Sequence, residues 1–120
     1  INHGLKALQN SVSAWTAEAL KQTMPASVFS RSTEVHNQDK VSMGLNAALS
    51  AGEVVALLGQ VSATQLIAVS NAAALRDEAR ISQGGRRFLN EIRKRSSVLE
   101  FDRRLDRDLG ELVAWMDRLV

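Results

Sequence analysis

The feature that most restricts the fold of this chain is its uncharged centre. Residues 54–75 form a run of 22 without a charged side chain, and fifteen of them are apolar. Helix-forming residues also predominate around this run, and no proline occurs between residues 34 and 82. The sequence therefore predicts one helix over 34–82, about 70 Å long at about 1.5 Å per residue. A helix of that length favours an elongated molecule.

A shorter helix is predicted at the start of the chain, over residues 4–23. There Leu8, Val12 and Trp15 recur at spacings of four and three, which places them on one side of a helix. Pro25 is the only proline in the chain. Because proline lacks an amide hydrogen and disfavours helical geometry in the residue before it, the helix is expected to end there.

The last part of the chain reads as a charged helical region over 86–119. The paired Gly84 and Gly85 predict a turn before it, and the final helix is expected to start at Val98, with ion pairs between residues four apart. Its apolar residues share one face, namely Leu105, Leu109, Leu112 and Met116. No stretch alternates as a strand would. The predicted fold class is all-α: a single domain over 1–120, an elongated helical bundle with one long central helix and an amphipathic C-terminal helix.

Small residues on the central helix predict a close-packing seam. Gly52, Ala56, Gly59 and Ala63 recur at spacings of four, three and four, so a second helix can approach closely. Packing within the chain and contact between subunits both stay open, and an elongated chain of 120 residues favours a homo-oligomer. The expected interface combines this seam with the apolar face of the last helix. A membrane-inserted or pore-forming helix is a further alternative, although a polar stripe argues against a lone span.

The residues that enzymes and metal sites use are sparse. The chain has no cysteine and only two histidines, His3 and His36, which lie far apart, so no metal site is predicted. Neither a phosphate-binding glycine loop nor a serine nucleophile motif is present. The sequence thus predicts no catalytic, cofactor-binding or metal-binding residue and no cofactor, and favours a protein that is not an enzyme.

Charge distribution gives one alternative function. The formal net charge is only +2, but 20 of the 28 charged residues lie after residue 75. A basic group there could contact phosphates, as in a helical nucleic-acid-binding or regulatory module; it comprises Arg86, Arg87, Arg93, Lys94 and Arg95. Acidic residues interrupt it, so a solvated surface or a protein partner is the favoured interpretation.

Over residues 37–89 the sequence resembles the TrbJ-like conjugal transfer proteins. The resemblance is carried by the run from Leu45 to Leu58, by the charged segment from Ala74 to Arg80, and by the ending from Gln83 to Leu89. It implies a helical minor pilus or stalk subunit of a type IV secretion or conjugation apparatus, acting in pilus assembly and target-cell contact. It also implies export to the periplasm or cell surface, with a signal peptide outside the sequence, and other subunits of the apparatus as partners.

Overall fold

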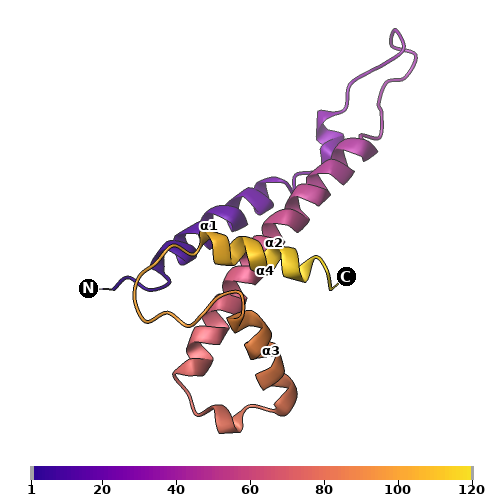
Figure 1. Cartoon of the computed structure of the whole chain (residues 1–120). Coiled ribbons are helices and arrows are strands. Elements are labelled where there is room, and N and C mark those ends of the chain that lie inside the picture. The colour runs from indigo at the N-terminus through magenta and orange to yellow at the C-terminus, as the bar shows by residue number, and fades with distance from the viewer. Residues whose placement is uncertain (1, 120) are drawn as a thin grey trace.

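The fold is entirely helical in the part of the chain that the computed structural model describes, which is residues 2–119 apart from the side chain of Glu78. Its elements are α1 (Lys6–Lys21), the 3-10 turn η1 (Ala26–Phe29), α2 (Gly44–Ala74), the 3-10 turn η2 (Glu78–Arg80), α3 (Gln83–Arg93) and α4 (Asp106–Met116). The molecule measures 67 × 34 × 22 Å. The predicted all-α class and elongated shape are confirmed (Figure 1).

Helices α1 and α2 form an antiparallel pair, and the loop between them extends from one end of the molecule (Figure 1). The start of α1 follows Gly4, whose φ of +58° suits glycine. Lys21 lies in the last turn, where a cation complements the helix dipole. As predicted, α1 ends before Pro25.

The central helix is shorter than the sequence predicts, because α2 spans Gly44–Ala74 and not 34–82. The backbone is left-handed at Glu34, Val35, His36 and Met43, and these conformations interrupt an α-helix. Serine, asparagine and aspartate, which occur at intervals between residues 30 and 42, bond to nearby backbone and favour turns over helices. Residues 75–82 likewise leave the helix for a turn that contains η2.

Helix α3 begins earlier than predicted and includes both glycines in its first turn. The hydroxyl oxygen of Ser82 caps it by accepting a hydrogen bond from the Gly85 amide at 3.2 Å. A Cβ atom at Gly85 would lie only 2.8 Å from Cγ2 of Ile81. The glycine thus permits a close approach inside a helix, and the turn that it was expected to form lies before Ser82.

The last helix also differs from the prediction, because α4 begins at Asp106 and not at Val98. The expected ion pairs between residues four apart are replaced by Arg104–Asp106 at 2.6 Å and Arg103–Asp108 at 2.7 Å. Both aspartates lie in the first turn of α4, where negative charge complements the helix dipole.

The core lies where α3 and α4 pack on the second half of α2. Ile67 of α2, Ile92 of α3 and Leu112 of α4 are fully buried. The rest of the buried hydrophobic cluster comprises Leu8, Ala63, Leu89, Leu105 and Trp115. The first half of α2 lies outside this cluster, and Leu49, Val55 and Leu58 there remain more than half exposed.

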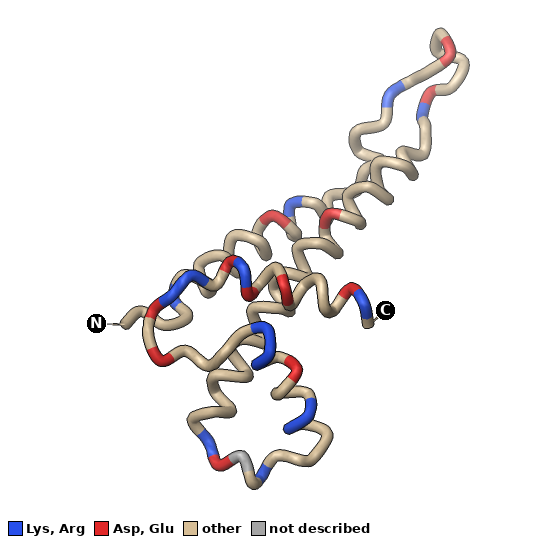
Figure 2. The backbone as a smooth tube through the Cα atoms, viewed as in Figure 1, with Lys and Arg blue, Asp and Glu red and all other residues tan. Residues whose placement is uncertain are grey.

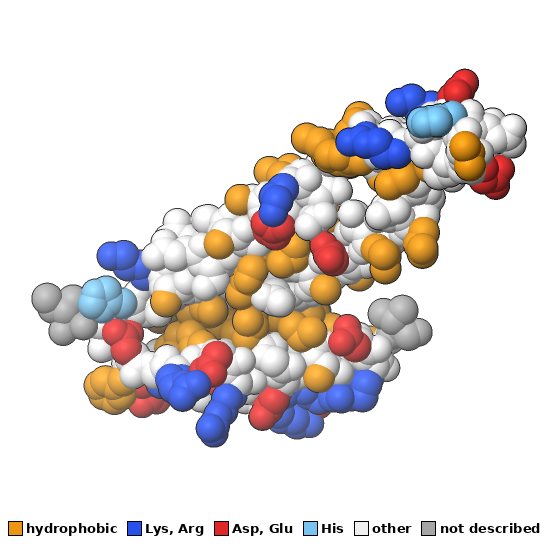
Figure 3. Space-filling view, turned by 90° about the horizontal axis from the view of Figure 1, so that it is seen from above, with side chains coloured by type: hydrophobic (Ala, Val, Ile, Leu, Met, Phe, Trp, Pro, Cys, Tyr) orange, Lys and Arg blue, Asp and Glu red, His pale blue; other side chains and the backbone are white. Residues whose placement is uncertain are grey.

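Charge is divided along the molecule as the sequence predicts. Lys and Arg, Asp and Glu gather on the loop, on α3 and around α4, whereas most of α2 carries none (Figure 2). Hydrophobic side chains are exposed at the surface between the α1/α2 pair and the charged side chains around α4 (Figure 3). By length and composition alone α2 could cross a membrane, with a mean hydropathy of 1.4 over its most apolar window.

The segment before α4 also holds the start of α1. The carboxylate of Asp102 accepts hydrogen bonds from the backbone amides of His3 at 2.7 Å and Gly4 at 2.8 Å. These bonds lower the pKa of Asp102 below its usual value. Asp102 therefore fixes the two residues that lead into α1 to the segment before α4.

The lowered pKa predicts an acid-sensitive stability. A carboxyl group whose pKa is lower in the folded than in the unfolded chain stabilises the fold at neutral pH, and that contribution is lost as pH falls below about 4. Glu91 and Asp106 also have lowered pKa values and act in the same direction. Asp102→Asn is therefore expected to lower Tm at pH 7 and to reduce its fall on acidification, measured by circular dichroism. An unchanged pH profile would contradict this role of Asp102.

Glycines on α2 and α4 predict opposite effects of the same substitution. Gly59 faces Cγ1 of Val113, which would lie 4.0 Å from an added Cβ, whereas an added Cβ at Gly110 meets nothing within 4 Å. A Cβ fits there at ordinary contact distance, but the rest of a leucine side chain would extend toward Val113, so Gly59→Leu should destabilise by about 1–3 kcal/mol through overpacking. Gly110→Leu should stabilise by up to about 1 kcal/mol through helix propensity. Chemical denaturation of both variants measures the difference, and equal changes would contradict close packing at Gly59.

Candidate functional site

The loop between η1 and α2 is a small hairpin with its own hydrogen bonds. At its base the Ser30 hydroxyl donates to the Val41 carbonyl at 2.8 Å and accepts from the Val41 amide at 2.9 Å. Further out, the Thr33 amide donates to the Gln38 carbonyl at 3.0 Å, and the Gln38 amide donates to the Thr33 carbonyl at 3.2 Å. These pairs give the loop a defined shape, although residues 31–40 are all exposed.

The tip of this hairpin contains an unusual backbone. Glu34, Val35 and His36 have φ values of 53°, 56° and 67°, so three successive residues other than glycine are left-handed. Each such residue costs about 1–2 kcal/mol, and a β-branched side chain such as Val35 makes this conformation rarer still. Val35 is also fully exposed. Strain of this kind gathers at functional sites, which makes the tip the leading candidate in the chain.

Polar side chains cover the tip and constrain one another. The Ser32 hydroxyl lies 2.7 Å from Nδ1 of His36, which leaves the Nε2 edge of the imidazole outside this contact. The side-chain amide of Asn37 donates to the carboxylate of Glu34 at 3.4 Å. Gln38 bonds to Thr33 through its backbone amide and carbonyl, and its side chain takes no part in those two bonds. The tip therefore offers an imidazole, two amides and a carboxylate within five residues.

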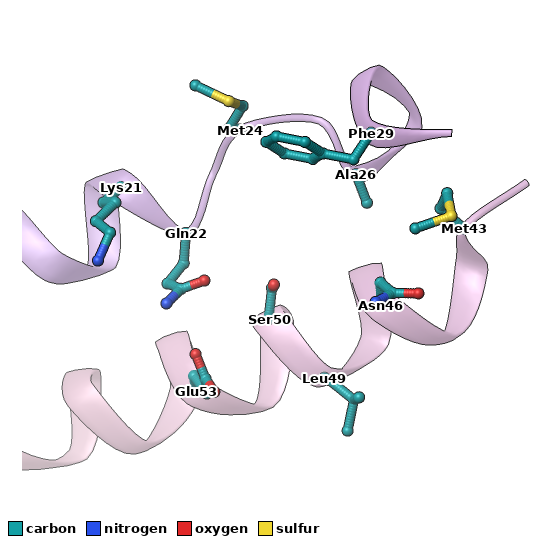
Figure 4. Close-up of a pocket in the computed structure, with 10 residues that line it drawn as sticks. All are labelled: Lys21, Gln22, Met24, Ala26, Phe29, Met43, Asn46, Leu49, Ser50 and Glu53. Carbon is teal, nitrogen blue, oxygen red and sulfur yellow. The ribbon is translucent and has the colours of Figure 1, made fainter. Parts of the chain in front are cut away.

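A hollow of about 650 Å³ lies at the root of the loop, where α1, η1 and α2 meet. Asn46, Ser50 and Glu53 border it from α2, and Phe29 and Met24 border it from the opposite side (Figure 4). Its lining mixes polar and apolar groups, as binding sites do. The loop and this hollow together form the candidate functional site.

The structure separates the predicted interface residues into different environments. Gly52 and Ala56 are exposed, Gly59 is half-buried against α4 and Ala63 is fully buried. The apolar face of the last helix is occupied within the chain: Leu105 and Leu112 belong to the core, and Leu109 and Met116 pack against it. A contact between subunits through these residues stays a prediction.

Sequence reasoning missed the loop because it placed residues 34–43 inside the long helix. One signal was available, since Ser32, Asn37, Asp39 and Ser42 are turn-forming residues at short intervals. The prediction that the chain has no catalytic or cofactor-binding residue was made with this segment placed inside a helix, and it stays a prediction. Among the described side chains, no group of three or more histidine, aspartate or glutamate residues is placed to hold a metal ion.

Comparison with known proteins identifies the family. The family model described as aromatic amino acid lyase matches residues 1–94. The chain belongs to the aromatic amino acid lyase family. Histidine ammonia-lyase of Stigmatella aurantiaca is 31% identical to it over 98% of the chain, and tyrosine ammonia-lyase of Cereibacter sphaeroides is 31% identical over 93%. These matches cover 23% and 22% of the two relatives, so the chain spans about a quarter of their length.

A solved structure shares both the family and the fold. The crystal structure of histidine ammonia-lyase from Trypanosoma cruzi superposes with a TM-score of 0.89 and 25% sequence identity, over 98% of this chain and 23% of the other. The helices described above thus recur inside a polypeptide about four times as long. This chain thus corresponds in fold to about a quarter of that ammonia-lyase.

Membership of the aromatic amino acid lyase family corrects several predictions. The resemblance to TrbJ-like proteins over residues 37–89 is wrong, as is the function of a secretion or conjugation pilus subunit, because the family match spans the same residues. The interpretation as a protein outside enzyme families is wrong, since the relatives are ammonia-lyases. The predicted periplasmic or surface location depended on the pilus resemblance and is wrong with it. Partners from a secretion apparatus find no support, whereas a homo-oligomer remains consistent with the family.

Proposed function

We propose that this chain is the part of an ammonia-lyase that presents the 30–43 loop to an aromatic amino acid. The observation that carries the proposal is the left-handed backbone at three successive residues of an exposed, hydrogen-bonded tip. The helices of this chain do not need that strain, because the loop extends away from the core (Figure 1). A strained tip is retained where its geometry serves a ligand.

The side chains of the tip suit the two charged ends of an amino acid. The amides of Asn37 and Gln38 can donate to a carboxylate, and the carboxylate of Glu34 can accept from an ammonium group. His36 has its Nδ1 engaged with Ser32 at 2.7 Å, and under this proposal its other ring nitrogen contacts the substrate. These residues would bind and orient the substrate. In the elimination the Cα–N bond breaks and ammonia leaves, while Cβ loses a proton and the Cα=Cβ double bond forms.

The class of substrate follows from the relatives. One is named histidine ammonia-lyase and another tyrosine ammonia-lyase, so the side chain of the substrate is proposed to be an imidazole or a phenol. Because the chain spans about a quarter of these relatives, other parts of the site would come from elsewhere in the complete gene product or from a second copy. The proposed partner is a homo-oligomer.

The test is an assay of the complete gene product with histidine, tyrosine and phenylalanine. Elimination of ammonia from any of them leaves an unsaturated acid, which ultraviolet absorbance detects as it forms. With histidine or tyrosine, we expect one molecule of ammonia to be released for each molecule of unsaturated acid formed. A correctly folded product that releases none from any of the three would overturn the proposal.

A further inference from the structure

The base of the loop between η1 and α2 is closed by a side chain. Among the described residues, two pairs of hydrogen bonds join residues 30–33 to residues 38–41. The outer pair runs between the backbones of Thr33 and Gln38. In the inner pair the Ser30 hydroxyl donates to the Val41 carbonyl at 2.8 Å and accepts from the Val41 amide at 2.9 Å. Ser30 thus holds the two arms together at the point where they leave the helices.

Burial separates Ser30 from the rest of the loop. Its exposed fraction is 4%, whereas residues 31–40 are all exposed. A serine hydroxyl can donate one hydrogen bond and accept others, so this one buried side chain bonds to both backbone groups of Val41. Alanine at position 30 would remove both partners at once. The bonds of Ser30 are therefore expected to set the direction in which the loop leaves η1 and α2.

The length of the loop amplifies any movement at its base. Val35 at the tip follows Ser30 by five positions, which corresponds to roughly 15 Å at about 3.3 Å per residue. Over that length a rotation of only about 4° at the base moves the tip by about 1 Å. A misplacement of about 1 Å in an active site can cost about 100-fold in rate. The orientation of the tip is thus sensitive to the two bonds of Ser30.

We propose that Ser30 is a positioning residue, which holds the tip of the loop in the orientation that binds the amino acid substrate. The inference rests on the proposed function of the loop. Ser30 acts through the loop and not on the substrate, because its hydroxyl both donates to and accepts from Val41.

This role predicts a separation of KM from kcat. Without the Ser30 hydroxyl, only the molecules whose loop is still in place bind substrate, so the apparent affinity falls by that fraction. Saturating substrate selects those molecules. The value of kcat should therefore be retained while KM rises.

Hydrogen exchange and steady-state kinetics of the complete gene product test this role. In Ser30→Ala the amides of Thr33 and Gln38 should exchange about 10-fold faster, because two hydrogen bonds no longer hold the base of the loop. KM should rise several-fold, and kcat should change by less than about two-fold. Tm should change little, since the buried hydrophobic cluster includes no loop residue.

Ser13→Ala is the matched control. It removes a hydroxyl that also donates to a backbone carbonyl, that of Gln9 at 3.2 Å, but Ser13 lies in α1, outside the loop and the hollow at its root. Its loop amides and its kinetics should match the parent.

The two readouts separate this inference from the proposed function. Loop amides in Ser30→Ala that exchange as in the parent would overturn the role of Ser30, whatever the kinetics. Faster exchange with an unchanged KM would also overturn it, and would mean that the loop does not bind substrate. A parent that releases no ammonia overturns the proposed function and this role with it, whereas faster exchange would still show that Ser30 holds the loop.

Discussion

Replacing Gln38 with alanine is expected to lower kcat/KM for the amino acid substrate by about 100-fold, the usual effect of removing one donor aimed at a charged group in an active site. The fold should survive. Gln38 is tied to Thr33 by its backbone amide and carbonyl at 3.2 and 3.0 Å, and alanine keeps both groups. The variant thus removes the side-chain amide while the shape of the loop remains.

The matched control for this variant is Gln83→Ala, which removes the same amide from an exposed residue in the first turn of α3. That helix lies at the other end of the molecule from the loop (Figure 1). Steady-state kinetics of the complete gene product, with circular dichroism of each variant, should show a loss for Gln38→Ala alone. Equal activity of the two variants would contradict a role for Gln38 in binding substrate.

Leu112→Ala is expected to destabilise the chain by about 2–5 kcal/mol, the range for a leucine removed from a closed core. Leu112 is fully buried where α4 packs on α2. The size of the effect depends on how far the surrounding side chains close the cavity, and neighbours from three helices restrict that movement. A loss of this size is a large part of the stability of a domain of this length.

Urea denaturation measures this loss against a control on the same side of the molecule. Leu119 is 64% exposed and lies beyond the end of α4, so Leu119→Ala should change the free energy of unfolding by less than about 0.5 kcal/mol. Similar losses in both variants would mean that α4 is not anchored through Leu112.

Hydrophobic periodicity was sufficient to predict the helices that pack on the core. Leu8 is buried on α1 as its spacing predicts, and Leu89 and Ile92 are buried on α3. Both ends of α2 were predicted wrongly, because the absence of proline does not make a segment helical. Local hydrogen bonds shape the loop before α2, such as those of Ser30 with Val41 and of Asn37 with Glu34. A pattern of apolar residues does not register such bonds.

Neither the family nor the candidate site could be predicted from hydrophobic periodicity and short motifs. The run from Leu45 to Leu58 is rich in alanine, leucine and valine, and many unrelated helices share that composition, so it supported a resemblance to the wrong family. The loop residues from Ser32 to Gln38 contain neither a phosphate-binding glycine loop nor a serine nucleophile motif. Their significance lies in a left-handed backbone, and the residues that adopt it, Glu34, Val35 and His36, are not those that usually mark such a conformation.

The bond between Asp102 and the start of α1 has a consequence for how the chain folds during synthesis. The carboxylate that holds the Gly4 amide lies 98 residues further along the chain. While the ribosome is making α2 and α3, the amides of His3 and Gly4 therefore lack this partner, and the residues before α1 are not held against the segment before α4. The start of α1 is therefore anchored only after a segment 98 residues further along the chain has been synthesised.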